Sequence, residues 1–348
     1  MRFALATLLV ALCLCGCGPS SPSSPDAGTL DAGSVPDAGI LDAGPTPDAG
    51  ALDAGPTPDA GDLTLSMGEW NVEFFGLADG GPVDDAVQGA NVATIMGRAD
   101  MDLWALEEVC DETAFNQVLD QLRTQYGQDF GVVYPDDPTA VSNPNPSYGS
   151  VWHQRTALVY RKSVATVVGA DLVHRTDLDP SWTSAFAGTR DPLEVHLQIA
   201  APSGEKDLWV LVIQLKAGPD TGSYAKRQAA AADLHAYLAS AHPGDAVIVA
   251  GDWNDTLVGS ICATCGDSPF AVLVNDTANV LFPTLALAVD GGTTETDFDD
   301  SVVDNHMITA PLFGAYLGEV GRVDVSSVDY AGDSTSDHYP TFVRYHLR

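Results

Sequence analysis

The sequence predicts an α/β fold, a mixed-sheet sandwich rather than a Rossmann-type parallel sheet. Short apolar runs of strand length alternate with helical patterns, and predicted strands outnumber predicted helices. Several strands also follow one another without an intervening helix, which favours mixed over purely parallel pairing. No glycine-rich phosphate loop of the Walker or dinucleotide type occurs in the sequence.

The first elements of the folded part are two strands, each followed by a helix. Leu63–Phe75 and Met101–Val109 are apolar runs of strand character. Val87–Arg98 has a helical pattern, and so has Thr113–Tyr126, in which apolar residues recur three and four positions apart. This spacing gives each helix one apolar face for packing against a sheet.

The later elements are mostly strands, with one long helix. Tyr224–Ser240 is rich in alanine and predicts that helix. The predicted strands are rich in Val, Leu and Ile, and they are Thr156–Tyr160, Leu193–Ile199, Leu208–Leu215, Ala246–Ala250, Val302–Thr309 and Tyr339–Tyr345.

Residues 1–17 have the pattern of an export signal. Apolar residues run from Phe3 to Leu14, about the length of a signal-peptide core and too short to span a bilayer as a helix. The run ends in Leu-Cys-Gly-Cys, which resembles a bacterial lipobox with Cys17 as the lipid-carrying residue. We expect a lipoprotein signal peptide with Cys17 as the lipidation site; an ordinary signal peptide cut elsewhere is the alternative.

Residues 18–62 are predicted to be a disordered linker. Asp-Ala-Gly recurs seven times, spaced by Pro, Thr, Ser and single aliphatic residues, without strand or helix periodicity. Such a segment cannot bury enough apolar surface to offset the entropy of ordering it. A calcium-binding β-roll would need alternating aliphatic residues that are missing, so we expect a solvated acidic tether stiffened by proline.

Residues 63–348 form the predicted catalytic domain, which is strongly acidic. Seven of the 48 acidic residues lie in the repeats and Arg2 lies in the signal, so the rest of the chain carries 41 acids against 14 Lys and Arg. A protein that grips nucleic acid through a basic face would differ. The acidic excess fits an exported protein with a site that collects divalent cations.

Three cysteines lie in this domain: Cys110, Cys262 and Cys265. Export implies an oxidising compartment, so we expect one disulfide and one remaining thiol. Either Cys262 and Cys265 form a local bridge, or Cys110 pairs with one of them.

Five polar clusters interrupt the predicted strands near their C-terminal ends or in the loops that follow. Their Asn, Glu and Asp side chains are the hard oxygen ligands that Mg²⁺ prefers. A histidine beside aspartates can stabilise the charge that develops on a phosphate. No serine or cysteine nucleophile with a matching base is apparent, which favours direct attack by water. The clusters are Trp70-Asn71-Val72-Glu73, Leu106-Glu107-Glu108-Val109, Gly251-Asp252-Trp253-Asn254, Val303-Asp304-Asn305 and Ser336-Asp337-His338.

In this order, the clusters resemble the endonuclease/exonuclease/phosphatase superfamily, which is deoxyribonuclease I-like. The resemblance extends over essentially all of residues 63–348, and Gly-Asp-x-Asn followed by Ser-Asp-His is its most specific part. It implies a four-layered α/β sandwich, in which two mixed β-sheets pack face to face with helices outside. It also implies cleavage of phosphate esters with Mg²⁺, or with Mn²⁺ or Ca²⁺ in its place.

The resemblance also implies roles for individual residues. Glu108 is the expected principal metal ligand, with Asn71, Glu73 and Asp337 beside it. Glu107 is expected to be a packing or surface neighbour. The expected catalytic residues are Asp252 on the attacking water, Asn254 holding Asp252 and the phosphate, His338 at the scissile phosphate, and Asp304 positioning His338.

The chain departs from the family pattern at two glutamines. Gln214 stands where deoxyribonuclease-like members have a histidine, and Gln154 stands where they have its glutamate partner. Glutamine can hydrogen-bond phosphate but cannot deliver a proton. We therefore expect Gln214 to bind phosphate, and Lys216 and Arg155 are further candidate phosphate contacts, with surface charges as the alternative.

Three hypotheses about function follow. The first is a secreted or surface-anchored nuclease that acts on DNA or RNA, although Cys110 and Asp111 stand where a minor-groove arginine would lie. The second is a sphingomyelinase-like lipid or small-molecule phosphodiesterase, which the low basic content favours. The third is a non-catalytic surface binding protein.

Location and assembly are further expectations. Gly18, after the lipid cysteine, is not the aspartate linked to inner-membrane retention. We therefore expect an outer-membrane lipoprotein or a cell-surface protein that touches the membrane only through its lipid, and a monomer.

Overall fold

The first of two large sheets is built around the strand that opens the folded part. The structure, a computed structural model, describes residues 62–77, 80–135, 142–143, 152–173, 182–186, 191–289, 293–295, 301–330 and 334–348. The strand order is β13-β14-β1-β2-β6-β3, with β1 and β2 parallel and the other pairs antiparallel. The strands are β1 (Leu63–Phe75), β2 (Leu103–Val109), β3 (Phe130–Val133), β6 (Arg155–Arg161), β13 (Tyr316–Arg322) and β14 (Thr341–Leu347).

The second large sheet has the same size and the same kind of parallel centre. Its order is β11-β12-β10-β9-β8-β7, and β9 and β10 are its parallel pair. A separate two-stranded sheet pairs β4 (Ser142–Asn143) with β5 (Trp152–His153). The strands of the second sheet are β7 (Ala165–Leu172), β8 (Leu193–Ala201), β9 (Gly204–Gln214), β10 (Val247–Asp252), β11 (Val280–Leu281) and β12 (Asp304–Thr309).

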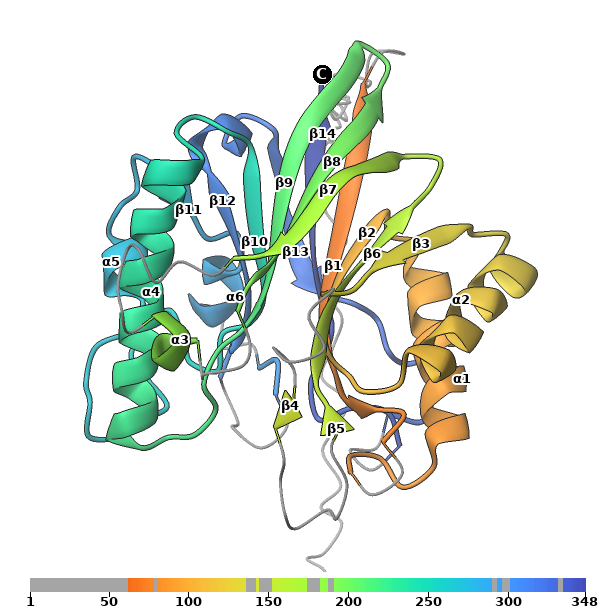
Figure 1. Ribbon diagram of the computed structural model, residues 1–348, viewed down its shortest axis with the longest axis horizontal. Coiled ribbons are helices and arrows are strands. Elements are labelled where there is room, and N and C mark those ends of the chain that lie inside the picture. The colour runs from red at the N-terminus through yellow and green to blue at the C-terminus, as the bar shows by residue number, and fades with distance from the viewer. Residues whose placement is uncertain are drawn as a thin grey trace, which may run out of the picture. The chain divides into compact units, whose positions relative to one another are not determined.

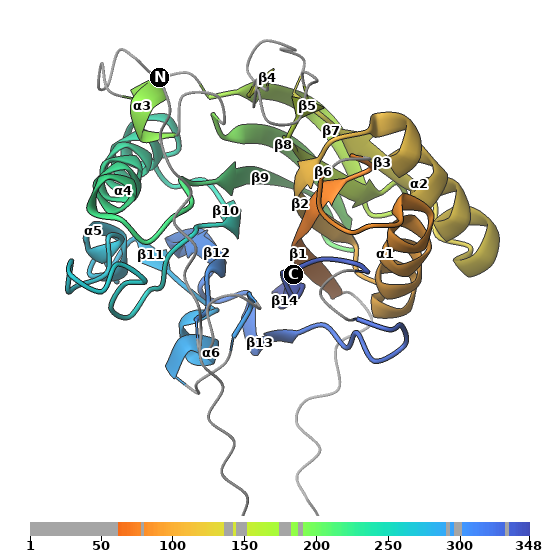
Figure 2. The same ribbon diagram turned by 90° about the horizontal axis from the view of Figure 1, so that it is seen from below.

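Helices cover the outer face of each sheet, which makes four layers (Figures 1 and 2). Two helices pack on the first sheet, α1 (Asp85–Ala99) and α2 (Glu112–Tyr126). Three pack on the second sheet, on the other side of the molecule in Figure 1: α3 (Trp182–Ala185), α4 (Thr221–Ala241) and α5 (Ala271–Val274). The remaining helical segments are α6 (Leu285–Val289) and the 3₁₀ helix η1 (Ala310–Leu312).

Alternation along the strands separates the three buried layers. On β1, Leu65 and Met67 face the second sheet, whereas Trp70 and Val72 face α1 and α2. The inward-facing positions of both sheets are aliphatic over most of their length and form one core between the sheets. They become polar at Glu69 and Asn71, so the core ends where the polar clusters begin.

The predicted fold class is confirmed: two mixed sheets pack face to face, with helices outside. Each strand and helix expected from the sequence is present. A disulfide joins Cys262 to Cys265, and Cys110 is a free thiol. The predicted signal peptide, Cys17 and the linker up to residue 61 lie outside the described residues. Within the described part, no helix is both long enough and apolar enough to cross a membrane.

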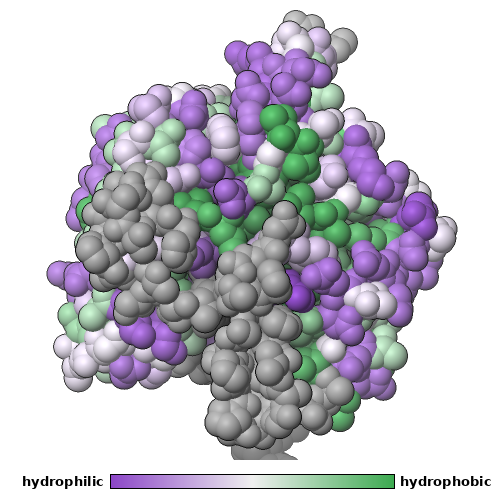
Figure 3. Space-filling view, viewed as in Figure 1, coloured by the Kyte–Doolittle hydropathy of each residue, from purple (hydrophilic) through white to green (hydrophobic). Residues whose placement is uncertain are grey.

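The described surface is mainly hydrophilic over the two helical layers, and hydrophobic residues gather between them on the face seen in Figure 3. Among the described residues, the most exposed large hydrophobic side chains are Val83, Val168, Val258 and Val289, which lie on separate loops, a strand and helix α6. Single exposed apolar residues of this kind are common on protein surfaces.

Candidate active site

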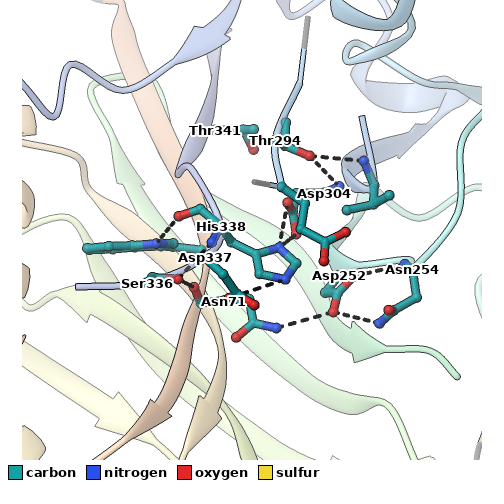
Figure 4. Close-up of polar contacts among 12 residues, drawn as sticks. Asn71, Asp252, Asn254, Thr294, Asp304, Ser336, Asp337, His338 and Thr341 are labelled. Atoms are coloured by element: carbon teal, nitrogen blue, oxygen red, sulfur yellow. Dashed lines mark hydrogen bonds and ion pairs between the residues drawn. The ribbon is translucent and has the colours of Figure 1, made fainter. Parts of the chain in front are cut away.

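Both parallel strand pairs end on the same side of the molecule, and this brings the polar clusters together. Asn71 on β1 pairs with Glu107 on β2, and Asp252 on β10 pairs with Gln214 on β9. β12 runs antiparallel to β10, so its first residue, Asp304, lies opposite Asp252. The segment before β14 supplies Asp337 and His338. Figure 4 shows Asn71, Asp252, Asp304 and His338 directed toward one another.

Three of the polar residues have an unusual backbone conformation. Glu73, Glu108 and Asn254 have positive φ angles of 44°, 62° and 54°. The pairing of β2 shifts register against both neighbours in this region. Left-handed conformations of non-glycine residues cost on the order of 1–3 kcal/mol each and concentrate at functional sites. The unusual backbone conformations thus coincide with the polar clusters.

Gly251 is required by the close approach of β10 to β9. A Cβ atom at this position would lie 1.9 Å from the carbonyl oxygen of Ile213, and the φ of Gly251 is 150°. Only glycine fits such a position. The glycine of the Gly-Asp-x-Asn motif is therefore required by the backbone. Its conformation sets the direction in which the chain continues to Asp252.

Asp252 is almost fully buried and held by three donors. The Asn254 backbone N–H donates to Oδ1 at 2.8 Å, and the Asn254 side-chain amide donates to Oδ2 at 2.6 Å. The Asn71 amide donates to Oδ2 at 3.2 Å, from the opposite sheet. Both asparagines thus fix the orientation of one carboxylate (Figure 4).

His338 is fixed through both its ring and its backbone. Its Nδ1–H donates to the carboxylate of Asp304, at 3.0 and 2.9 Å from the two oxygens. The hydroxyl of Ser336 accepts from the His338 N–H at 3.0 Å and donates to the Asn71 carbonyl at 2.7 Å. The Trp70 indole donates to the His338 carbonyl at 3.0 Å. Since Asp304 occupies Nδ1, the Nε2 atom is left for other partners.

Electrostatics around His338 favour its charged form. Burial alone lowers the pKa of His338, but Asp304, Asp252 and Asp337 outweigh it and raise that pKa well above the usual value. Burial raises the pKa of Asp252 to about 7; Asp304 and Glu108 add to the rise and His338 opposes it. The site therefore combines the cationic imidazole of His338 with the carboxyl group of Asp252, whose pKa is near neutral.

Glu73, Glu108 and Asp337 form an acidic group beside this pair. Glu73 accepts a hydrogen bond from the Asp337 backbone N–H at 2.8 Å, and Glu108 accepts one from the Phe74 backbone N–H at 3.1 Å. Burial and the charge of Asp337 raise the pKa of Glu73 to about 7. Burial and Glu108 raise that of Asp337. This clustering of hard oxygen ligands fits a divalent cation.

Two residue triples have ligand atoms within 4.8 Å of one another. The first is Asp252, Asp304 and His338, and the second is Glu295, Asp337 and His338. Of the predicted metal ligands with carboxylates, Asp337 belongs to one triple and Glu73 and Glu108 belong to neither.

The three predicted phosphate contacts have different surroundings. Gln214 is buried, and its amide donates to Glu108 Oε1 at 2.6 Å. Arg155 forms an ion pair with Glu112 at the start of α2, at 3.3 Å. Lys216 follows β9, and its carbonyl accepts from Arg227 at 2.6 Å. The structure thus brings Gln214 into the cluster and gives Arg155 a partner outside it.

Glu295 is a member of the cluster that sequence reasoning missed. Its backbone forms a β-bridge with His338, and only 9% of the residue is exposed. Burial raises its pKa to about 8; the charge of Asp252 adds to the rise and that of His338 opposes it. The preceding Thr294 hydroxyl accepts from the Asp304 N–H at 3.1 Å. Neither residue lies in a periodic apolar run, so the sequence contained no signal for them.

A second missed feature lies directly beneath the cluster. Glu69 and Glu107 are both fully buried between the sheets, and Glu69 accepts from the Thr341 hydroxyl at 2.9 Å. Burial raises the pKa of both carboxyl groups well above the usual value. Glu107 is therefore a buried neighbour of the cluster, which agrees with the packing role expected for it.

A buried ion pair connects two loops of the cluster. Arg227 on α4 and Asp255 are both inaccessible to solvent and lie 2.7 Å apart. Arg227 also donates to the carbonyls of Lys216 and Gly218, at 2.6 and 2.9 Å. Asp255 accepts from the Ser260 hydroxyl at 2.8 Å. The loop after β9 is thereby tied to the loop that carries Asn254.

The chain is similar in sequence and fold to proteins of one family. The family model described as "Endonuclease/Exonuclease/phosphatase family" matches residues 68–270. No curated protein matches the sequence.

Solved structures share the fold at low sequence identity. They include D. rerio TDP2 complexed with a single-strand DNA product (TM-score 0.55, 14% identity, 82% of this chain and 99% of that chain). The human Nocturnin catalytic domain with bound sulfate has a TM-score of 0.54 at 15% identity, over 82% and 95% of the two chains. A Bacteroides thetaiotaomicron endonuclease/exonuclease/phosphatase family protein has a TM-score of 0.52 at 14% identity, over 82% and 99%.

The family model covers more than half of the chain, and the sandwich of the neighbours is also the fold observed here. Enzymes of this family use divalent metals to hydrolyse phosphate esters. The chain belongs to the endonuclease/exonuclease/phosphatase family and is a metal-dependent phosphoric ester hydrolase.

Proposed function

We propose that the protein is a Mg²⁺-dependent nuclease that hydrolyses DNA or RNA by direct attack of water. One observation carries the proposal: side chains from segments far apart in the sequence meet in one hydrogen-bonded cluster. Asn71 donates a hydrogen bond to Asp252 from the opposite sheet, and the imidazole Nδ1–H of His338 donates one to Asp304. The structure of D. rerio TDP2 with a single-strand DNA product supports nucleic acid as the substrate class.

Glu108, Glu73, Asn71 and Asp337 would hold the metal, Mg²⁺ or in its place Mn²⁺ or Ca²⁺. Three carboxylates and one amide oxygen are hard ligands of the kind that Mg²⁺ accepts. A divalent ion bound there supplies positive charge to the phosphate oxygens and the leaving group. The raised pKa values of Glu73 and Asp337 support this assignment, because burial and the neighbouring carboxylates disfavour their charged forms and a bound cation would favour them.

Asp252 would accept the proton of the attacking water. Its carboxylate is fixed by Asn254 and Asn71, so one orientation is preorganised. A base of pKa about 7 is ionised in a large fraction of molecules at neutral pH and still accepts a proton readily. No serine, threonine or cysteine nucleophile is needed for this step.

His338 would stabilise the charge that grows on the phosphate. Asp304 holds Nδ1–H and keeps the imidazole cationic, so Nε2–H is a donor of fixed direction. Charge-assisted donors of this kind are stronger than neutral ones. Asp304 acts through His338 and is a positioning residue.

The substrate class is tested with the purified protein, first freed of metal and then assayed with Mg²⁺ or EDTA. The substrates are supercoiled plasmid, single-stranded DNA, RNA and sphingomyelin. We expect Mg²⁺-dependent cleavage of nucleic acid. Turnover of sphingomyelin with intact nucleic acid would replace the nuclease with the lipid phosphodiesterase that the acidic composition favours. No turnover of any substrate would favour a non-catalytic binding protein.

We further propose that the nuclease is an outer-membrane lipoprotein or cell-surface protein, monomeric, and anchored through a lipid on Cys17. The apolar run, the Leu-Cys-Gly-Cys sequence and the acidic repeats support this location. Membrane fractionation of cells that express the wild-type protein or Cys17→Ala tests it. We expect the wild type with outer-membrane markers and Cys17→Ala in the soluble fraction. Recovery of the wild type with inner-membrane markers contradicts the proposal.

A further inference from the structure

Gln214 has a contact that its family-based role does not explain. As the last residue of β9, it is 1% exposed, and its backbone pairs with Asp252 on β10. Its side chain crosses to the other sheet, where Nε2 lies 2.6 Å from Glu108 Oε1. A carboxylate only accepts, so the hydrogen bond requires the amide nitrogen, and not the amide oxygen, to face Glu108.

Glu108 is held by two donors from different strands. Gln214 donates to Oε1, and the Phe74 backbone N–H donates to Oε2 at 3.1 Å. The Glu108 backbone is in the left-handed region, with φ of 62°, so its exit from β2 is also fixed. Each carboxylate oxygen keeps a second lone pair for a further partner. The carboxylate is thus oriented before any ligand binds.

The amide oxygen of Gln214 indicates that the site binds a ligand with hydrogen-bond donors. Within the described residues, Oε1 of Gln214 is buried and has no hydrogen-bond partner. Buried acceptors are rarely left unpaired. A hydrated Mg²⁺ offers donors of this kind, since it usually retains several of its waters in a protein site.

Gln154 is not the partner of Gln214. The two glutamines stand where the family has a glutamate–histidine pair, yet the Gln214 side chain donates its hydrogen bond to Glu108. Gln214 therefore takes part in a different interaction from the one that the resemblance implies. A neutral amide also stays a donor at every pH at which the protein is folded, unlike imidazole.

We propose that Gln214 is a positioning residue of the metal site: its amide N–H orients Glu108, and its amide oxygen accepts from the hydration shell of the bound divalent cation. This rests on the proposed function, in which Glu108 is a metal ligand. Hydrogen-bond partners of metal ligands typically change metal affinity by about 10–100-fold when they are removed. Gln214 belongs to the metal site and not to the phosphate-binding side chains.

The test is Mn²⁺ affinity, measured by calorimetry or electron paramagnetic resonance on the full-length protein without substrate. Gln214→Met keeps the length and volume of the side chain and removes both its donor and its acceptor. We expect it to bind Mn²⁺ about 10–100-fold more weakly than wild type. Gln214→His retains an N–H donor and should recover part of the loss. Gln228→Ala is the matched control on the exposed side of α4 and should bind as wild type.

Inorganic phosphate binding separates the two roles of Gln214. At saturating Mn²⁺, we expect Gln214→Met to bind phosphate within a few-fold of wild type. Wild-type Mn²⁺ affinity in Gln214→Met would overturn the proposal. A large loss of phosphate affinity with unchanged Mn²⁺ affinity would also overturn it and make Gln214 a phosphate contact.

Two further variants keep the outcome decisive. If Gln214→Met does not fold, as judged by its thermal melt, Gln214→Ala replaces it as the donor-free protein. Glu108→Gln tests the underlying site. If it retains wild-type Mn²⁺ affinity, the proposed metal site is wrong whatever Gln214 does. If it loses affinity and the donor-free Gln214 variant does not, only the role of Gln214 is wrong.

Discussion

The residues of the candidate site are dominated by carboxylates in close contact. Asp252, Asp304, Asp337 and Glu73 all interact electrostatically with the imidazole of His338, and Glu108 lies beside Glu73 and Asp337. Folding places these like charges together although their repulsion opposes the folded state. Such an arrangement is typical of sites selected for ligand binding or catalysis, because stability alone would disfavour it.

Stability without metal should therefore fall as the pH rises. Burial raises the folded-state pKa of Glu73 and Asp252 to about 7 and that of Glu295 to about 8. In the unfolded chain these carboxyl groups lose their protons near pH 4 to 5. Between that range and about pH 8, the folded state binds more protons than the unfolded state, so stability decreases with pH.

Thermal melts in EDTA at pH 5.5 and 8.5 check this prediction. We expect the lower melting temperature at pH 8.5, and we expect Mg²⁺ to raise the melting temperature more at pH 8.5 than at pH 5.5. Equal responses to Mg²⁺ at both pH values would show that the cation does not bind these carboxylates.

Gly251 gives a residue-scale prediction about the backbone. In Gly251→Ala, the Cβ would meet the Ile213 carbonyl oxygen, so β9 and β10 must separate. We expect the variant to be destabilised strongly, by several kcal/mol, because backbone cannot move aside as a side chain can. Gly169→Ala on β7 is the control, since its Cβ would have no neighbour within 4 Å. Similar melting temperatures for both variants would contradict the described approach of the strands.

At the scale of elements, the long helices α1, α2 and α4 were predicted, although their starts were placed late, and the short helices α3, α5 and α6 were not predicted. Asp84, Asp111 and Asp220 each accept hydrogen bonds from the first backbone N–H groups of α1, α2 and α4. These aspartates are strong N-cap residues. The helices predicted from the sequence begin one to three positions beyond the observed starts, because the caps themselves are polar.

The sequence did not predict strands that are short or whose residues are mostly exposed. β13, with the sequence Tyr-Leu-Gly-Glu-Val-Gly-Arg, lies at a sheet edge with no fully buried residue. β7 is likewise an edge strand, and most of its residues are exposed or half-buried. Pairing to one neighbour needs little apolar sequence, because the backbone supplies the contacts. Such strands can be identified only from their pairing with a neighbouring strand in the structure.

The Arg227–Asp255 pair gives a prediction for the loops between elements. Removing one partner of a buried ion pair leaves the other charge uncompensated, which typically costs about 3–5 kcal/mol. We expect Asp255→Asn to lower the melting temperature clearly and to reduce hydrolysis, since both connected loops border the cluster. Asp120→Asn, which removes an exposed partner of Arg123, should change stability by no more than about 1 kcal/mol. Chemical denaturation of both variants and of the wild type measures the two changes in the free energy of unfolding.

At the scale of the whole molecule, the sandwich brings residues from both ends of the domain into contact. Ser336 and Asn71 are hydrogen-bonded although they lie 265 positions apart, and Gln214 reaches Glu108 across 106 positions. Residue types in sequence order were sufficient to nominate most of the cluster through the family resemblance. Contacts such as Gln214 with Glu108, or the bridge of Glu295 to His338, depend on how two sheets face each other, which no local pattern encodes.

The central claim is metal-dependent phosphodiester hydrolysis at this cluster, and one measurement tests it most directly. The rate of nucleic acid cleavage is measured for the metal-free wild-type protein, for the same protein with Mg²⁺, and for Asp252→Asn with Mg²⁺. Asp129→Asn, at an exposed ion pair with Lys162, is the control. We predict cleavage only with Mg²⁺, wild-type rates for the control, and a loss of about 10²–10⁴-fold in Asp252→Asn with the fold intact. Cleavage in EDTA, or a wild-type rate in Asp252→Asn, would contradict the account.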